Sequence, residues 1–319
     1  MIKIGCAGIL VSDTFCGPMA GLPGEGQLLA VDQMPTKAGG CAANVAIDLA
    51  KQGLAVEVAG CLGNDASAQV VLASLEEHQI DTQRVVYSDS LPTSKTVILL
   101  VAGQDRRYIH SFGANAAFTV AHIDRDWVSG LTVFYLGGLF LMPAFRPDEL
   151  LDLLKFCRAR GVITVVDVVI PQNKPFQEDI AALLSAIDYF VPNEDEARIM
   201  TGTADSHQQL QALLKMGGRT VLVTRGRQGV VAGCGRDYWQ AGIYDMPDGV
   251  DPSGSGDAFT AGLIAGIVRG MDLPATLHYA SALGASAIRA LGTTDGVFTA
   301  DQAQEFIANH NLPIETGQF

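Results

Sequence analysis

The chain has 319 residues, of which 48% are hydrophobic and 17% are charged, a composition typical of a globular protein with a large core and not of a disordered chain. Its formal net charge of −13 argues against a nucleic-acid partner, because binding to a phosphate backbone requires clustered lysine and arginine. The same charge does not exclude a nucleotide, which backbone N–H groups and a metal ion can hold.

Short apolar runs alternate with amphipathic segments along most of the chain. We expect strands within residues 2–8, 55–60, 131–138, 161–169, 187–193 and 219–226. Between most of them, apolar residues at three- and four-residue spacing predict helices within residues 41–53, 66–80, 147–161 and 207–218. This alternation predicts an α/β fold, in which helices cover both faces of a parallel sheet and ligands bind beyond the carboxyl ends of the strands.

Two segments interrupt the alternation. Residues 14–37 are punctuated by glycine and proline, and only residues 27–34 have a strand-like pattern. Residues 93–112 are typical of a β-hairpin that turns at residues 102–105. We therefore expect one α/β domain over residues 1–319, with a small antiparallel lid formed by about 14–37 and 93–112.

Cysteine usage and the lack of targeting features predict a cytoplasmic protein. The six cysteines include no C-x-x-C pair, and no basic segment followed by an apolar one opens the chain. Residues 127–145 carry no charge, but Gly130, Gly137, Gly138 and Pro143 interrupt them. We interpret this stretch as strand, turn and loop, and we expect no membrane partner.

The stretch with the clearest chemical pattern is Gly254-Ser255-Gly256-Asp257, directly before a run of small apolar residues. Glycine-rich residues at a helix start leave backbone N–H groups free at the positive end of the helix dipole, which suits a transferring phosphoryl group. Asp257 would then face the group that these N–H groups hold. The alternative is that Asp257 only complements the helix dipole, as acidic residues in a first helical turn often do.

A second glycine pair, Gly39-Gly40, precedes another expected helix, with Asn44 one turn inside it. The glycines allow a small polar ligand to approach the backbone, and the amide of Asn44 offers both donors and acceptors to a hydroxyl. Asn44 alone is also compatible with an ordinary polar helix position. P-loop, dinucleotide-binding, H-E-x-x-H and G-x-S-x-G motifs are absent from the sequence.

These patterns together resemble the ribokinase/PfkB-like carbohydrate kinase family. Gly39-Gly40 with Asn44 resembles its N-terminal signature, and residues 251–262 resemble its C-terminal signature, D-T-x-G-A-G-D-x-F. The N-x-x-E motif of the family is matched by Asn193 and Glu196. A further family motif, T-x-G-x-x-G, and two segments similar to family segments lie in the matching order, at Thr224, Gly226 and Gly229, and at residues 60–69 and 111–118.

The resemblance implies a ribokinase-like fold and an ATP- and Mg²⁺-dependent transfer of phosphate to a hydroxyl. Asp257 would be the general base, with an anion hole of N–H groups from Gly254, Ser255, Gly256 and Asp257. The implied substrate-binding residues are Asp13, Gly39, Gly40 and Asn44, to which the hairpin and the segment after it add Arg107 and Asn115. The implied nucleotide-binding residues are Asn193, Thr224, Gly226, Gly229 and Ser281. Glu196 would hold Mg²⁺ through water, and Asp251 is a candidate ligand of a monovalent cation such as K⁺.

Departures from the family pattern leave the substrate open. Pro252 and Ser255 stand where threonine and alanine are common, Ser281 replaces a frequent asparagine, and the D-x-N-x-R pattern after Asp167 is missing. We interpret Arg106-Arg107 as a solvated hairpin pair, so an unphosphorylated sugar or sugar acid is favoured over a nucleoside, and a sugar phosphate comes third. A metabolite-binding regulator without catalysis is the alternative from another class. The apolar runs at residues 27–31 and 96–101 predict a homodimer through the lid.

Overall fold

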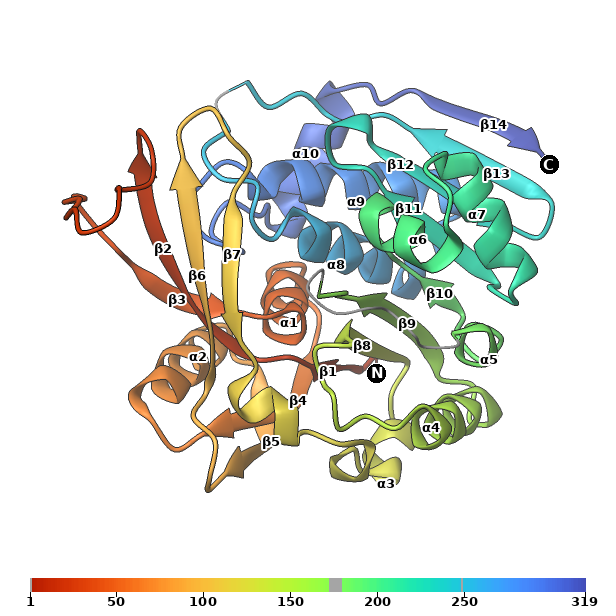
Figure 1. The fold of residues 1–319 in the computed structure, drawn as a ribbon. Helices are drawn as coiled ribbons and strands as arrows, with labels where there is room; N and C mark the ends of the chain where they lie inside the picture. Colours follow the sequence, from red (N-terminus) through yellow and green to blue (C-terminus); the bar gives the residue numbers. More distant parts are fainter. Residues whose placement is uncertain (1, 172–179, 248) are drawn as a thin grey trace.

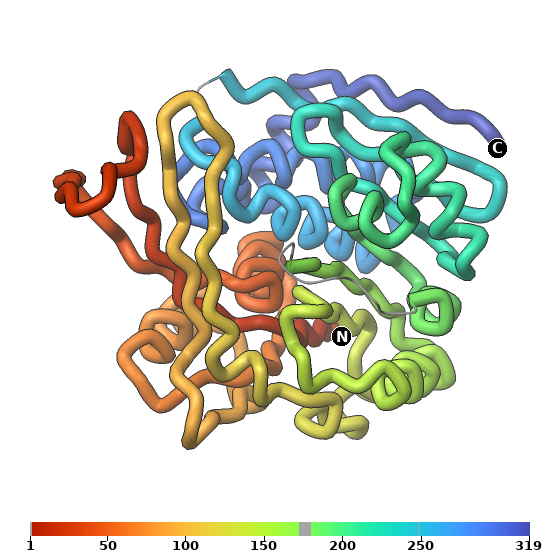
Figure 2. Tube along the Cα trace, in the orientation of Figure 1, coloured from red at the N-terminus to blue at the C-terminus, as the bar shows by residue number. Residues whose placement is uncertain are grey.

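The computed structural model describes residues 2–171, 180–247 and 249–319 (Figures 1 and 2). A ten-stranded sheet forms its centre. In spatial order the strands are β14 (Ile314–Gln318), β13 (Asp237–Ala241), β12 (Val230–Cys234), β11 (Thr220–Thr224), β10 (Tyr189–Phe190), β9 (Ile163–Val168), β8 (Val133–Leu139), β1 (Ile4–Gly8), β4 (Val56–Gly63) and β5 (Asp81–Ser88).

The strands from β11 to β5 are parallel, which confirms the parallel sheet expected from the alternating pattern. All six expected strand runs form strands of this sheet. The antiparallel edge β12–β13–β14 was not expected, because β12 and β13 form a short hairpin, whereas β14 joins them only after three intervening helices. The parallel edge strand β5 was not expected either. Every residue of β8 is buried, as in a strand covered on both faces.

Helices cover both faces of the sheet, and each face has its own hydrophobic core. One core contains residues of α1 (Cys41–Lys51), α2 (Ala66–Glu77), α8 (Ser255–Val268), α9 (Leu273–Ala287) and α10 (Ala300–Asn309). The other contains residues of α3 (Arg125–Ser129), α4 (Pro147–Ala159), α5 (Ala181–Leu184), α6 (Glu194–Thr201) and α7 (Ser206–Lys215). No helix in the described part of the chain is long and apolar enough to cross a membrane.

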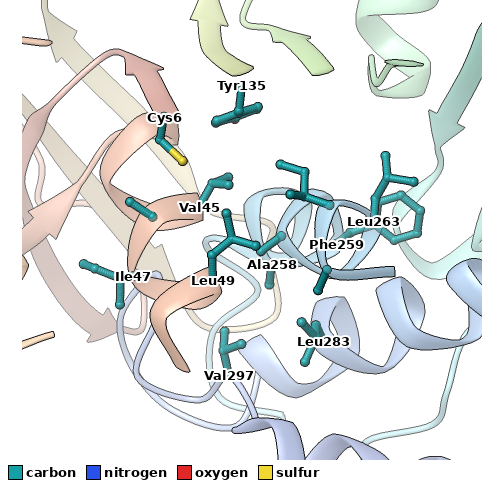
Figure 3. Packing of buried hydrophobic residues seen from close by; sticks show 14 of the residues in the cluster. Cys6, Val45, Ile47, Leu49, Tyr135, Ala258, Phe259, Leu263, Leu283 and Val297 are labelled. Carbon is teal, nitrogen blue, oxygen red and sulfur yellow. The ribbon is translucent and has the colours of Figure 1, made fainter. Parts of the chain in front are cut away.

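Helix α8 lies between α1 and α9 in the first core (Figure 3). Its residues from Ala258 to Gly266 are all buried, so it is apolar on every side. A methyl group on Gly262 would lie 2.5 Å from the Cα of Ala280 in α9. The small residues of α8 therefore allow close helix packing, and this packing fixes the helix whose first turn carries Asp257.

The lid is a separate four-stranded sheet. Its strands, in spatial order, are β3 (Thr36–Gly39), β2 (Val11–Met19), β6 (Ser94–Val101) and β7 (Arg107–Ser111). The β6–β7 hairpin confirms the hairpin expected over residues 93–112. The lid is not wholly antiparallel as expected, because β2 and β6 pair in parallel. The strand expected at residues 27–34 was wrong, because this exposed, glycine- and proline-flanked stretch finds no strand to pair with. Strand β2 begins earlier than expected, at Val11, and therefore includes Asp13.

Candidate active site

The candidate site lies at the carboxyl ends of the central parallel strands. The strand order reverses between β1 and β8, because β1 pairs with β8 on one side and with β4 on the other. Ligands of open α/β sheets bind at such switch points. Gly138 lies near the end of β8, Asp167 near the end of β9, and the chain enters the lid directly after β1.

Asp257 occupies the first turn of α8, where its carboxylate meets a side chain from α1. The Nδ2 group of Asn44 donates a hydrogen bond of 2.7 Å to Oδ2 of Asp257. The Oδ1 atom of Asn44 accepts a hydrogen bond of 2.8 Å from the Thr293 hydroxyl. Asn44 is buried, and Thr293 fixes its amide oxygen. Its amide nitrogen therefore holds Oδ2 of Asp257 in one position.

Two further groups lie beside this carboxylate. Sγ of Cys41 and carboxylate oxygens of Asp167 and Asp257 all lie within 4.8 Å of one another. Asp167 accepts hydrogen bonds from the Tyr135 hydroxyl and, at 2.6 Å, from the backbone N–H of Gly138. Burial and the nearby carboxylates raise the pKa of the Cys41 thiol well above its usual value, so the thiol is protonated and can donate to Asp257.

Asp13 reaches the same site from the lid. A methyl group on Gly39 would lie 1.8 Å from Oδ2 of Asp13, so only glycine permits this approach. The Thr96 hydroxyl of the neighbouring strand β6 also hydrogen-bonds the Asp13 carboxylate. The predicted substrate-binding residues Asp13, Gly39, Gly40 and Asn44 thus lie close to one another and to Asp257.

The acidic groups of the site share unusual electrostatics. Burial raises the pKa of Asp13 to about 7, and burial with the nearby charge of Asp257 raises the pKa of Asp167 to about 8. Burial likewise raises the pKa of Glu196 to about 8, and the charge of Asp167 adds to the effect. Burial also raises the pKa of Asp257, although contacts with Asn44 and Cys41 oppose that rise. A cation would relieve this repulsion, and the oxygen donors suit Mg²⁺.

We expect the ligand-free protein to lose stability as the pH rises from about 5 to 9. The folded state binds more protons than the unfolded state between the unfolded pKa of an aspartate, about 3.9, and folded values near 7 and 8, so the free energy of unfolding falls over that window. Thermal melts across this range measure the slope. The Asp13→Asn variant lacks one of these protons and should show a shallower fall; equal slopes for both proteins would contradict the assignment.

The predicted nucleotide-binding residues lie at the start of α6 and the end of β11. Asn193 caps α6, since its Oδ1 accepts from the Glu196 N–H at 2.9 Å and its own N–H donates to Glu196 Oε2 at 2.8 Å. Asn193 and Thr224 form an isolated parallel bridge, which places the two motifs side by side. At Gly229, with φ of 80°, a methyl group would lie 2.1 Å from the Ala241 carbonyl oxygen.

The buried carboxylate of Asp251 stabilises the loop before α8 through hydrogen bonds. Its Oδ1 accepts from the Ser253 N–H at 3.0 Å and the Ser253 hydroxyl at 2.8 Å, and its Oδ2 accepts from the Gly292 N–H at 3.3 Å. These partners are neutral, so the carboxylate still suits a monovalent cation. The Pro252 carbonyl is less suited, because it already accepts from the N–H and the hydroxyl of Ser255.

Three more predicted residues have surroundings of their own. Arg107 is exposed on β7 and donates to the Gln104 side chain at 2.5 Å. Asn115 is buried and bonds both the N–H and the carbonyl of Leu10. Ser281 is buried in α9. Their roles in binding stay predictions.

The sequence reasoning missed two residues of the centre, Cys41 and Thr293. Cys41 directly follows the glycine pair and begins α1, so its position was a usable indication. Thr293 lies 249 residues from its partner Asn44, in a turn that no motif marks.

Known proteins match this chain along most of its length. The family model described as pfkB family carbohydrate kinase matches residues 1–300. The ribokinase of Arabidopsis thaliana is 29% identical over 283 residues, covering 85% of this chain and 72% of that protein. The structure of that ribokinase complexed with ribose and ATP gives a TM-score of 0.80 at 24% identity, covering 96% of this chain and 98% of the other.

Two further proteins are also similar to the chain. The adenosine kinase of Saccharomyces cerevisiae is 27% identical over 282 residues, with 83% of this chain and 82% of that protein covered. A ribokinase-type protein of E. coli in complex with ATP and Mg²⁺ gives a TM-score of 0.81 at 20% identity, with 97% and 100% covered. The structural likeness confirms the ribokinase-like fold, and the family match confirms the resemblance first carried by the glycine motifs. The chain belongs to the pfkB family of carbohydrate kinases.

Proposed function

We propose that the protein transfers the γ-phosphate of ATP to a hydroxyl of a small, neutral sugar-like molecule, with Asp257 as the general base. The observation that carries this proposal is the pair formed by Asp257 and Asn44. In this pair, a carboxylate with one fixed oxygen lies in the first turn of α8, and it directly follows Gly254–Gly256 in the chain. A carboxylate there can accept the proton of a hydroxyl that attacks a phosphate held by the helix N–H groups.

The chain's own residues supply positioning and charge stabilisation. The phosphoryl transition state is loose, so backbone N–H groups from Gly254 to Asp257 stabilise its charge without any large movement. A late proton transfer to Asp257 then suffices, although an ionised aspartate is a weak base toward an alcohol. Glu196 would hold Mg²⁺ through water, and the bound ion supplies neutralisation of the phosphate charge. Asp251 is the residue that we propose for a monovalent cation.

The charges around the site favour a neutral acceptor. Asp13, Asp167 and Asp257 are carboxyl groups, which hydrogen-bond hydroxyl groups and, in their ionised form, repel a carboxylate or phosphate on a substrate. Among the residues that the structure describes, Arg107 points its guanidinium to Gln104 at the surface, and Lys37 pairs with Asp295 at 2.6 Å. The sequence favoured sugars and sugar acids equally; on these charges we propose neutral sugars first, nucleosides second, and sugar acids and sugar phosphates after them.

An ATP-coupled screen tests the proposal. The panel should contain neutral sugars, nucleosides, sugar acids and sugar phosphates, each assayed with Mg²⁺ and ATP. We expect turnover with at least one neutral polyhydroxylated compound. Turnover only with anionic acceptors would overturn the substrate class. Binding of ATP without turnover on the whole panel would favour a metabolite-binding regulator instead.

We also propose that the protein is a cytoplasmic homodimer that pairs through the lid. Leu28 is 91% exposed, and Leu22, Met34 and Ile109 of the lid region are also exposed. A partner subunit that packs on the lid would cover such exposed apolar side chains. All six cysteines are free, as expected of a protein in a reducing compartment. Light scattering on the purified protein measures the oligomeric state, and a monomer at micromolar concentration would rule out the dimer.

A further inference from the structure

The tip of the β6–β7 hairpin reaches the loop that leads into α8. In Figure 1 the hairpin lies beside the segment that precedes this helix. The Tyr108 hydroxyl of β7 hydrogen-bonds the side chain of Ser253. Tyr108 is 53% exposed, so packing alone does not account for its position.

A continuous series of side-chain hydrogen bonds extends from this contact in both directions. The Arg106 Nε–H donates to the Tyr108 hydroxyl, and the Arg106 guanidinium lies 5.6 Å from the centre of the Tyr108 ring. Ser253 in turn donates its hydroxyl proton to Asp251 at 2.8 Å. The proton of the Ser253 hydroxyl is thus used on Asp251, and its oxygen remains free to accept from the Tyr108 hydroxyl beside it.

This arrangement corrects the interpretation of Arg106 as half of a solvated pair. The Arg106 side chain is only 23% exposed, although it lies beside the turn of a hairpin. Its neighbour Arg107 is exposed and bonds Gln104. The two adjacent arginines thus differ in environment: Arg106 pairs with the neighbouring Asp105 at 3.1 Å and also bonds Tyr108, which contacts the loop before α8.

The lid also holds this loop from a second side. Lys37 of β3 donates to the Leu291 carbonyl at 2.9 Å and pairs with Asp295. Residues 291–295 contact the loop before α8 in turn, because the Gly292 N–H donates to Asp251 and the Thr293 carbonyl packs against Gly254. Both edge strands of the lid therefore reach the turn whose N–H groups form the anion hole.

We propose that Arg106 and Tyr108 are positioning residues that hold the Ser253–Gly254 turn in its phosphate-binding geometry when the lid lies over the site. This inference rests on the proposed function, because it presumes that the turn binds the phosphates of ATP. Ser253 directly precedes Gly254, so a change in the Ser253–Asp251 contact alters the direction of the N–H groups that follow.

The Tyr108→Phe variant tests this proposal, since it removes one hydroxyl from a half-exposed ring. With Mg²⁺ and ATP as the probe in calorimetry, we expect the Kd for ATP to rise by roughly 3- to 30-fold, the range for one hydrogen bond. Amide hydrogen exchange over residues 251–257 should become faster in the same variant. The melting temperature should stay within about 1 °C of the wild type, because exposed substitutions change stability little.

Two comparisons make the result specific. Tyr87→Phe removes the hydroxyl of a tyrosine that is 49% exposed on β5, and we expect it to bind ATP like the wild type. The double variant Arg106→Gln/Tyr108→Phe should bind no more weakly than the weaker single variant, because both residues act through one series of contacts. Wild-type affinity and exchange in Tyr108→Phe would overturn the inference. A wild-type protein that fails to bind ATP would instead overturn the proposed function.

Discussion

Replacement of Asp257 by asparagine is expected to lower kcat by roughly 10²–10⁴, the range for loss of a general base. The asparagine keeps the size of the side chain and an oxygen that can accept from Asn44, which lies 2.7 Å away in the wild type. It cannot take a proton from the attacking hydroxyl. Binding of ATP and acceptor should therefore persist while turnover falls, and steady-state kinetics with calorimetry measure the two effects separately.

The matched control for this variant is Asp301→Asn. Asp301 is the exposed acidic residue in the first turn of α10, where it complements a helix dipole and does nothing else that the structure shows. We expect this variant to keep wild-type kinetics. If Asp257→Asn were also near wild type in kcat, then Asp257 would have only the dipole role that its position in α8 also permits.

Stability gives the Asp257 variant a second readout. Burial raises the pKa of the Asp257 carboxyl, and its charge also raises the pKa of Asp167. A neutral amide removes this repulsion, so the variant should melt at or above the temperature of the wild type at pH 8. A loss of activity together with a gain in stability is expected when the replaced group serves catalysis at a cost to stability.

The sequence predicted most of the central sheet because its pattern is local. Six parallel strands are short apolar runs, and four of the helices between them have apolar residues at helical spacing, so their prediction needs no knowledge of distant residues. Strand β5 is largely polar and was missed, because only its pairing with β4 identifies it. The lid was harder to predict. The stretch at residues 27–34 has a strand-like pattern but no partner strand, whereas β2 begins at Val11 because it pairs with both β3 and β6.

The candidate site, like the fold, could be predicted from the sequence only in part. Glycine motifs identified Asp257 and Asn44, although these residues lie 213 positions apart and nothing local shows that they touch. Thr293 and Tyr108 carry no motif, and their roles follow only from contacts with Asn44 and Ser253 in the folded chain. Asn115 lies in a segment similar to a family segment, and its side chain bonds the Leu10 backbone, a contact that the motif did not indicate.

The anion hole itself is tested by alanine at two glycines of one turn. At Gly254, φ is 78° and an added methyl group would lie 2.0 Å from the Thr293 carbonyl oxygen. Gly254→Ala is therefore expected to cost about 1–3 kcal/mol in the free energy of unfolding from the left-handed backbone alone. It should also lower kcat/KM on the order of 10²-fold, because displacement of Thr293 disturbs Asn44 and hence Asp257.

Gly256 is the control, and its outcome separates folding from ligand binding. A methyl group there meets no protein atom within 4 Å, and the residue lies in the first turn of α8. Gly256→Ala should thus keep or raise the melting temperature, since alanine is favoured over glycine in a helix by up to about 1 kcal/mol. If the turn holds a phosphate against its backbone, the same methyl group obstructs it, and the Kd for ATP must rise although the protein is at least as stable. A Gly256→Ala variant with wild-type ATP affinity would contradict the anion hole, because a phosphate bound to this turn would collide with the added methyl group.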